Sequence, residues 1–349
     1  TRVLVLNAVD PANAGPLVTM ARERKVPVIA YDRLVSGAPL DYYVSFDNYN
    51  AGKLQGQALL DAVRARGDGE LLWVDGPASD VNAGAFAAGA HEILDGKVTV
   101  AARFQIPGPG WNVEQVRTWL RATLPTMRSR KIIGVYSPID PVSAGVVAEL
   151  QAAGISPLPA VTGQDSDVAG LQRVMAGQQL MTLYKPFRLE ATKAAEVAFD
   201  LLRGRKPAAD TTVDNKAGAV PSYLLQPVPV TRDTIKATVL KDGFVSTAAL
   251  CAGDYADDCR ALGLGRAGRW DLVAGPGPGA GPMGGSFLLD RFDEVDTDKS
   301  GQLSRDEVTA WTAARQQEMR QRIEDHIKAA DTNGDGIGDF AGISERLDH

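Results

Sequence analysis

Residues 26–60 read VPVIAYDRLVSGAPLDYYVSFDNYNAGKLQGQALL, and this stretch decides the fold class. Runs 26–32 and 42–47 are rich in β-forming residues, whereas residues 49–66 repeat apolar side chains three and four positions apart, as in a helix. The same alternation continues to residue 202. Strands rich in Val, Ile and Leu that are separated by helices predict an α/β fold of parallel sheets flanked by helices.

The pattern places strands and helices along most of the chain. The expected strands are 3–9, 26–32, 42–47, 70–75, 98–106, 131–137, 158–165 and 181–186. The expected helices are 49–66, 82–94, 112–124, 141–153, 167–176 and 189–202. Because ligands of parallel sheets bind beyond the carboxyl ends of the strands, the polar residues that follow these strands are the candidate site.

Composition and motifs argue against several classes of function. The 37 Lys and Arg against 43 Asp and Glu give a net charge of −6, and no basic block is present, which argues against non-specific nucleic-acid binding. No apolar run is long enough to span a membrane. No Gly-rich phosphate loop follows a strand, and the three histidines offer no evident acid–base group, so we expect a binding protein and not an enzyme.

Four stretches carry a resemblance to a known family over residues 1–250. They are VPVIAYDRLV, YYVSFDNYNAGKLQGQAL, VTGQDSDVAGLQRVMAGQQLMTLYKPFRLEATKAAEVA and ADTTVDN followed by VPSYLLQPVPVTRDTIKATVLKDGF. They resemble the periplasmic substrate-binding proteins of D-xylose-type ABC importers, which have the two-lobe type I fold. The resemblance implies a monomer in the periplasm or elsewhere in the cell envelope. It would capture a xylose-like monosaccharide between its lobes and deliver it to an ABC permease.

The resemblance also implies ligand-binding residues. They are Asp32, Arg33, Asn82, Trp111, Asp165 and Lys185. The residue types suit a sugar, because carboxylates accept hydrogen bonds from hydroxyl groups, cationic and amide groups donate to oxygens, and an indole covers an apolar C–H face.

The resemblance also implies the domain boundaries. Residues 1–106 are expected to form the N-terminal lobe, and residues 107–250 the C-terminal lobe, with a chain crossing near its end. Because the family has a strand, a helix and a second strand ahead of the segment that opens here, we expect an incomplete N-terminal lobe. A Cys-containing segment and a Gly/Pro linker occupy 251–285. The spacing of Cys251 and Cys259 alone leaves a disulfide and free thiols open, and a periplasmic location favours the disulfide.

Residues 286–349 form a module of different character, with 15 acids and 8 bases. One loop has EF-hand spacing and provides the calcium ligands Asp296, Asp298, Ser300, Gln302, Ser304 and Glu307. A second, less regular loop offers Asp331, Asn333, Asp335, Ile337 and Asp339, with Gly342 where the bidentate Glu belongs. The sequence therefore predicts Ca²⁺ as a cofactor, bound more tightly by the first loop.

Two alternatives remain open at this stage. The chain could be a calcium-binding interaction protein whose incomplete lobe no longer binds sugar. The stretch DTNGDGIGDFAGISERLDH also resembles the calcium loop of α-amylase-type glycoside hydrolases, which suggests a remnant enzyme, although the chain ends without a barrel.

Overall fold

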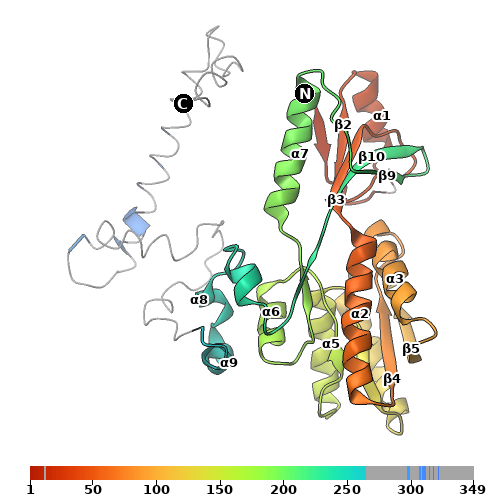
Figure 1. Cartoon of the computed structure of the whole chain (residues 1–349), viewed down its shortest axis with the longest axis vertical. Coiled ribbons are helices and arrows are strands. Elements are labelled where there is room, and N and C mark those ends of the chain that lie inside the picture. Colours follow the sequence, from red (N-terminus) through yellow and green to blue (C-terminus); the bar gives the residue numbers. More distant parts are fainter. Residues whose placement is uncertain are drawn as a thin grey trace. The chain divides into compact units, whose positions relative to one another are not determined.

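The computed structural model describes residues 1–11 and 13–264, together with residues 297, 298, 306, 307, 309–311, 314, 317 and 321. The chain divides into two units, Thr1–Leu272 and Val273–His349. Within the first unit, two lobes are each built on their own sheet, with helices packed on the sheet faces (Figure 1). The α/β class predicted from the alternation of strands and helices is confirmed.

The first lobe, called the N-lobe, is a five-stranded sheet in the order β1-β2-β3-β10-β9. Its strands are parallel except β9, which pairs antiparallel with β10. The elements are β1 (Leu4–Leu6), α1 (Gly15–Glu23), β2 (Val28–Tyr31), β3 (Tyr42–Phe46), α7 (Phe187–Leu202), β9 (Thr211–Asp214) and β10 (Ala219–Leu225).

Strand β2 shows why this lobe needs helices on both faces of its sheet. Val28 and Ala30 pack in one apolar cluster with Val18 of α1, whereas Ile29 packs in another with Val197 of α7. Successive side chains of a strand point to opposite faces, so an unbroken apolar run requires cover on each side.

The second lobe, called the C-lobe, contains a parallel four-stranded sheet in the order β5-β4-β6-β7 and an antiparallel pair, β8 and β11. The strands are β4 (Glu70–Asp75), β5 (Thr99–Gln105), β6 (Ile132–Tyr136), β7 (Ala160–Val161), β8 (Thr182–Tyr184) and β11 (Val228–Val230). The longer helices are α2 (Asn48–Arg66), α3 (Val81–Leu94), α4 (Val113–Thr123), α5 (Asp140–Ala152) and α6 (Val168–Met175). Short helical segments are η1 (Leu124–Met127), η2 (Lys236–Leu240), α8 (Thr247–Leu250), η3 (Gly253–Tyr255) and α9 (Ala256–Ala261).

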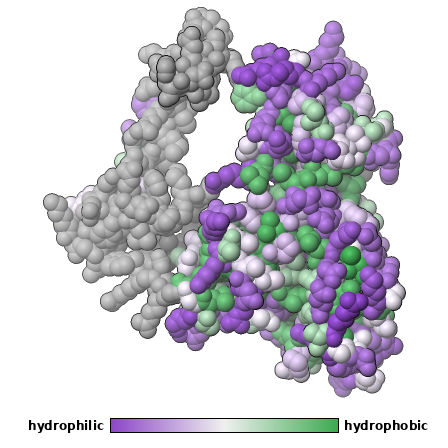
Figure 2. Space-filling view, in the orientation of Figure 1, coloured by the Kyte–Doolittle hydropathy of each residue, from purple (hydrophilic) through white to green (hydrophobic). Residues whose placement is uncertain are grey.

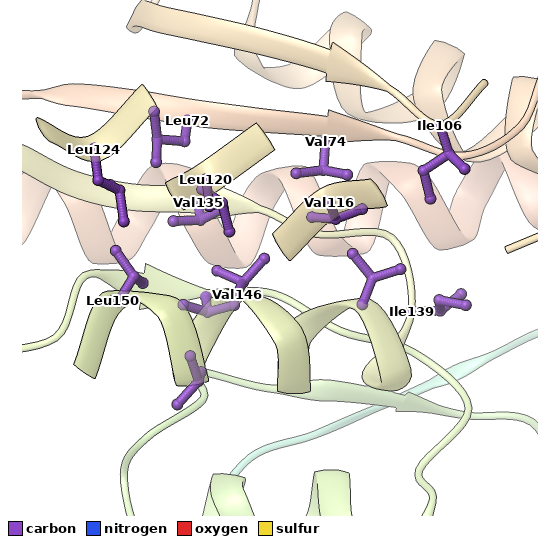
Figure 3. Close-up of a cluster of buried hydrophobic side chains, with 13 residues drawn as sticks. Leu72, Val74, Ile106, Val116, Leu120, Leu124, Val135, Ile139, Val146 and Leu150 are labelled. Atoms are coloured by element: carbon purple, nitrogen blue, oxygen red, sulfur yellow. The ribbon is translucent and has the colours of Figure 1, made fainter. Parts of the chain in front are cut away.

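The largest apolar cluster of the C-lobe lies between its sheet and helices α4 and α5 (Figure 3). Leu72 and Val135 extend from the sheet toward Leu120 of α4 and Val146 of α5, and all four side chains are fully buried. Burying an aliphatic side chain of this size contributes about 1.5–3 kcal/mol. This core anchors the sheet whose strand ends carry polar residues.

The chain passes between the lobes three times, from β3 to α2, from β8 to α7 and from β10 to β11. Two of these crossings are hydrogen-bonded to each other. The Asp47 N–H donates to the Leu225 carbonyl at 2.8 Å, and the Asn50 amide donates to Gln226 Oε1 at 2.7 Å. The β3–α2 and β10–β11 crossings are therefore joined side by side. Figure 2 shows hydrophobic residues gathered at the waist between the lobes, on an otherwise mostly hydrophilic face.

The lobe boundary expected after residue 106 is wrong. Strands β4 and β5 pair with β6 in the C-lobe sheet, so the first passage between lobes lies where β3 leads into α2. The chain then returns to the N-lobe through α7, β9 and β10. The strand expected at 158–165 is also much shorter, because the backbone leaves the sheet after β7 and turns at Asp165 and Ser166.

The cysteine-containing segment belongs to the C-lobe and is not part of a separate linker. Cys251 and Cys259 form a disulfide, as a periplasmic location favours, and both are buried in an apolar cluster with Met175 and Val239. Most calcium ligands predicted from sequence lie outside the described residues. These are Asp296, Ser300, Gln302, Ser304, Asp331, Asn333, Asp335, Ile337 and Asp339.

Candidate functional site

Two of the predicted ligand residues, Asp32 and Asp165, have left-handed backbone conformations in the segments that follow strands β2 and β7. Asp32 follows β2 with φ 61°, and Asp165 lies beyond β7 with φ 90°. The Asp32 N–H donates to the Val44 carbonyl, and the Asp165 N–H donates to the Leu183 carbonyl, both at 2.9 Å. Such conformations are rare for residues other than Gly and concentrate at binding sites, where the surrounding structure maintains them.

Contacts at the strand ends join the two lobes. Arg33 Nη2 lies 3.9 Å from Asp80 Oδ2, which is at the N-cap of α3 in the C-lobe. The same Asp80 oxygen accepts a hydrogen bond from the Trp111 indole at 3.1 Å. Asn82, two residues further on, directs its amide toward the Asp32 carbonyl at 3.4 Å. The N-lobe residues Asp32 and Arg33 therefore face the beginning of α3.

Trp111 is held close to the C-lobe backbone. A Cβ added to Gly76, which follows β4, would stand 2.3 Å from the Trp111 ring. Only Gly at this position lets the half-buried indole lie against the end of the strand. The ring also packs against two apolar clusters of the C-lobe.

Lys185 is a buried cation at the crossing between β8 and α7. Its ammonium group donates to Asn48 Oδ1 at 3.2 Å and lies 5.0 Å from the centre of the Phe86 ring. Burial raises the pKa of the carboxyl groups of both Asp32 and Asp165, whereas the positive charge of Lys185 lowers each pKa. One ammonium group thus acts on carboxylates from both lobes.

A third carboxyl group lies in the same electrostatic field. Glu190, in the first turn of α7, is 1% exposed, and its Oε1 has no hydrogen-bond partner among the described residues. Burial, followed by the negative charge of Asp32, raises the pKa of Glu190 to about 7, while the Tyr31 hydroxyl and Lys185 lower it. Burial, followed by the negative charge of Glu190, raises the pKa of Tyr31 to about 12.

The structure thus brings the six predicted residues into one region. Asp32, Arg33 and Asn82 meet across the lobes, Lys185 acts on both aspartates, and Trp111 joins them through Asp80. Three further polar residues of this region were not among the predicted ligands. They are Asn48, Asp80 and Glu190. Two of them carried a local signal: Asn48 follows the strand expected at 42–47, and Asp80 is an N-cap residue two positions before Asn82.

Comparison with known proteins decides the family. The family model described as "Periplasmic binding protein domain" matches residues 1–206, more than half of the chain. The chain belongs to the periplasmic binding proteins. A D-xylose-binding periplasmic protein of Escherichia coli is 38% identical to this periplasmic binding protein over 247 residues, which cover 69% of this chain and 73% of the relative.

Other relatives agree. A D-xylose-binding periplasmic protein of Haemophilus influenzae is 34% identical, over 65% of this chain and 68% of the relative. A carbohydrate transporter solute binding protein from Chloroflexus aurantiacus, solved in complex with D-glucose, is 28% identical with a TM-score of 0.65. It is matched over 71% of this chain and 81% of that protein. These relatives are named as binding proteins, and the Chloroflexus aurantiacus protein is the solute binding protein of a carbohydrate transporter.

Two expectations about this periplasmic binding protein are thereby confirmed. The two-lobe type I fold is shared with solved sugar-binding proteins, and the location is periplasmic, as for the matched family. Among the described residues, every helix is too short or too polar to be a membrane span.

In the second unit, the described residues include two of the predicted calcium ligands, Asp298 and Glu307. Glu307 Oε1 accepts hydrogen bonds from the backbone N–H groups of Thr297 at 2.9 Å and Asp298 at 3.2 Å. The carboxylate at position 12 of the predicted loop is therefore folded back onto positions 2 and 3. The described residues contain no group of three or more metal-binding side chains.

Proposed function

We propose that this periplasmic binding protein captures a neutral, xylose-like monosaccharide between its lobes and delivers it to the permease of an ABC importer. The observation that carries the proposal is the cross-lobe group Asp32, Arg33, Asn82 and Lys185, to which Asp165 is electrostatically coupled. A ligand held between lobes needs polar groups from each lobe, and these residues provide them. The names of the relatives, D-xylose-binding periplasmic proteins, support the substrate class.

The charges of the site favour a neutral polyhydroxy ligand. Arg33 lies within 4.0 Å of both Asp32 and Asp80, and Lys185 is offset by Asp32 and Asp165. The cations therefore already face carboxylates, and an anionic sugar acid would add negative charge beside them. Sugar hydroxyl groups donate to the carboxylates and accept from the cations, and a mismatched hydroxyl leaves a buried group unpaired at a cost of about 1–3 kcal/mol.

Calorimetric titration with D-xylose, D-glucose, D-ribose and D-glucuronate tests this proposal. The neutral sugars should include a ligand, and D-glucuronate should not bind. Asp165→Ala should weaken the affinity at least tenfold, whereas Asp61→Ala, at an exposed position of α2, should leave it unchanged. A wild-type protein that binds none of the neutral sugars, or an Asp165→Ala variant that binds as tightly as wild type, would refute the proposal.

The permease of the importer is the proposed protein partner, and the binding protein acts as a monomer that needs no nucleic acid. We propose that the sugar-loaded form of the protein is the one that binds this membrane component. Transport assays with permease in vesicles should therefore require the sugar-loaded protein.

We propose calcium binding as a second property, carried by the loop from Asp296 to Glu307. The observation that favours it is the return of the Glu307 carboxylate to positions 2 and 3 of the loop, where a bidentate ligand at position 12 closes a calcium site. Asp296, Asp298, Ser300, the Gln302 carbonyl and Ser304 complete the oxygen ligands. The loop from Asp331 to Gly342 lacks that carboxylate and should bind more weakly.

Calorimetry with calcium tests this second proposal. Glu307→Gln should remove the tighter binding event, and Glu324→Gln, outside both loops, should retain it. Retention of the tighter event in Glu307→Gln would refute the assignment. If the wild type binds calcium but no sugar, the alternative of a calcium-binding interaction protein takes the place of the sugar-binding proposal.

A further inference from the structure

Asp140 lies beneath the loop that carries Asp165, at the first position of α5. It is fully buried. Its Oδ1 accepts a hydrogen bond from Gln179 Nε2 at 2.7 Å, and its Oδ2 accepts one from Thr182 Oγ1 at 2.8 Å. Its N–H donates to the Gln164 carbonyl at 2.9 Å. The Asp140 side chain is therefore enclosed by these partners, and the residue is hydrogen-bonded directly to the loop.

The backbone N–H groups of three successive loop residues, 165–167, donate hydrogen bonds to the neighbouring C-lobe structure. The Asp165 N–H donates to the Leu183 carbonyl at 2.9 Å, and the Ser166 N–H donates to Thr182 Oγ1 at 3.1 Å. The Asp167 N–H donates to Asp140 Oδ2 at 3.2 Å. The Thr182 hydroxyl therefore links the loop to Asp140, because it accepts from one and donates to the other.

These hydrogen bonds maintain an unfavourable backbone conformation at Asp165 and Ser166. Asp165 has φ 90° and Ser166 has φ 54°, two consecutive left-handed residues that are not Gly. Such residues persist only where the surrounding structure over-determines them. The packing around Asp140 is correspondingly close, since a Cβ added to Gly163 or Gly170 would stand 2.2 Å and 2.3 Å from its carboxyl oxygens.

A buried cation completes the support. Arg173 Nη2 donates to the Asp140 carbonyl at 2.8 Å, and Arg173 Nε donates to Gln179 Oε1 at 3.0 Å. Each hydrogen bond that reaches the Asp140 carboxyl group comes from a donor, namely Gln179, Thr182 and the Asp167 N–H. The substitution Asp140→Asn would place an NH2 donor opposite one of these three donors, so one hydrogen bond would be lost. The side-chain volume would stay nearly the same.

We propose that Asp140 is a positioning residue for sugar binding, which acts with Thr182 to hold the loop in the conformation that presents Asp165 to the ligand. The inference rests on the proposed sugar-binding function of the same cleft. It assigns specificity to a residue that makes no contact with the sugar, because the direction of the Asp165 carboxylate depends on the backbone that Asp140 supports.

The test compares sugar affinity in Asp140→Asn, Thr182→Val and Thr182→Ser with the wild type. Asp140→Asn and Thr182→Val should each weaken binding at least fivefold, and Thr182→Ser, which keeps the hydroxyl group, should stay within twofold. In an Asp165→Ala background, Asp140→Asn should cause no further loss of affinity, because its effect passes through Asp165. Thermal unfolding of each variant reports stability separately. If Asp140→Asn does not fold, the two Thr182 variants decide the matter.

Deoxy sugars separate positioning from general damage. One monodeoxy analogue of the bound sugar should lack the hydroxyl group that Asp165 binds. Asp165→Ala should bind this analogue as tightly as the wild type does. Asp140→Asn should weaken the parent sugar and leave this analogue unchanged. Equal weakening of both ligands, or wild-type affinity in both Asp140→Asn and Thr182→Val, would overturn the inference. If wild type binds no monosaccharide, the proposed function itself fails, and the inference falls with it.

Discussion

Replacing Glu190 by Gln should change how the stability of the protein depends on pH. The carboxyl group is 1% exposed, and its pKa is raised from 4.5 to about 7, mainly by burial. A difference of that size corresponds to about 3 kcal/mol between the two protonation states. Because the pKa is higher in the folded protein than in the unfolded chain, ionisation of Glu190 opposes folding.

The sign follows from this difference. Below pH 4.5 the Glu190 carboxyl group is protonated in both the folded and the unfolded protein, so it does not lower the free energy of unfolding. Between pH 4.5 and about 7 the wild type loses stability as the pH rises, because the group ionises in the unfolded chain first. Above that window the loss is complete. Glu190→Gln cannot ionise, so its stability relative to wild type should improve by about 3 kcal/mol from pH 4.5 to pH 8. At the acidic end the variant should be slightly the less stable, since its amide gains an unpaired buried donor.

Urea unfolding followed by tryptophan fluorescence measures this difference at several pH values. The matched control is Glu196→Gln on the same helix, where the side chain is 56% exposed and pairs with Lys193. The control should follow the wild-type pH dependence throughout. A stability difference between Glu190→Gln and wild type that is the same at pH 4.5 and pH 8 would show that the pKa of Glu190 is not raised in the folded protein.

Other substitutions test the C-lobe. Cys251→Ser should lower the free energy of unfolding by about 2.5 kcal/mol, because the disulfide to Cys259 closes a loop with a sequence separation of 8; equal urea midpoints with and without the bond would contradict this. Gly170→Ala should destabilise the protein by about 2 kcal/mol or more in the same assay, since its Cβ would meet the buried carboxylate of Asp140. Gly84→Ala, in the open on α3, should instead be neutral or stabilising by up to about 1 kcal/mol. Similar effects of the two alanines would show that the packing at Gly170 is looser than described.

Local pattern predicted much of the secondary structure. Strand β4 was predicted with the bounds Glu70–Asp75 that the structure shows, and α2 and α3 differ from prediction by one residue at their N-termini. Helix α1 and strands β9 to β11 were not predicted. β9 and β11 are short runs, and β10 gains its stability from pairing with β3, which is far away in the sequence.

The α/β class, the positions of most strand ends and the family resemblance that selected six candidate ligand residues could be predicted from the amino-acid sequence. Those properties are local, because the hydrophobic periodicity and the polar residues that follow each strand depend on residues that are consecutive in the sequence. The lobe that each segment joins became known from the folded structure, since an apolar face does not specify its partner. β10 pairs with β3 across the sequence, and the C-lobe contains residues that were expected in the N-lobe. The folded structure likewise revealed Glu190 beside Asp32 and Asp140 beneath Asp165, because burial and hydrogen bonding between distant residues exist only once the chain is folded.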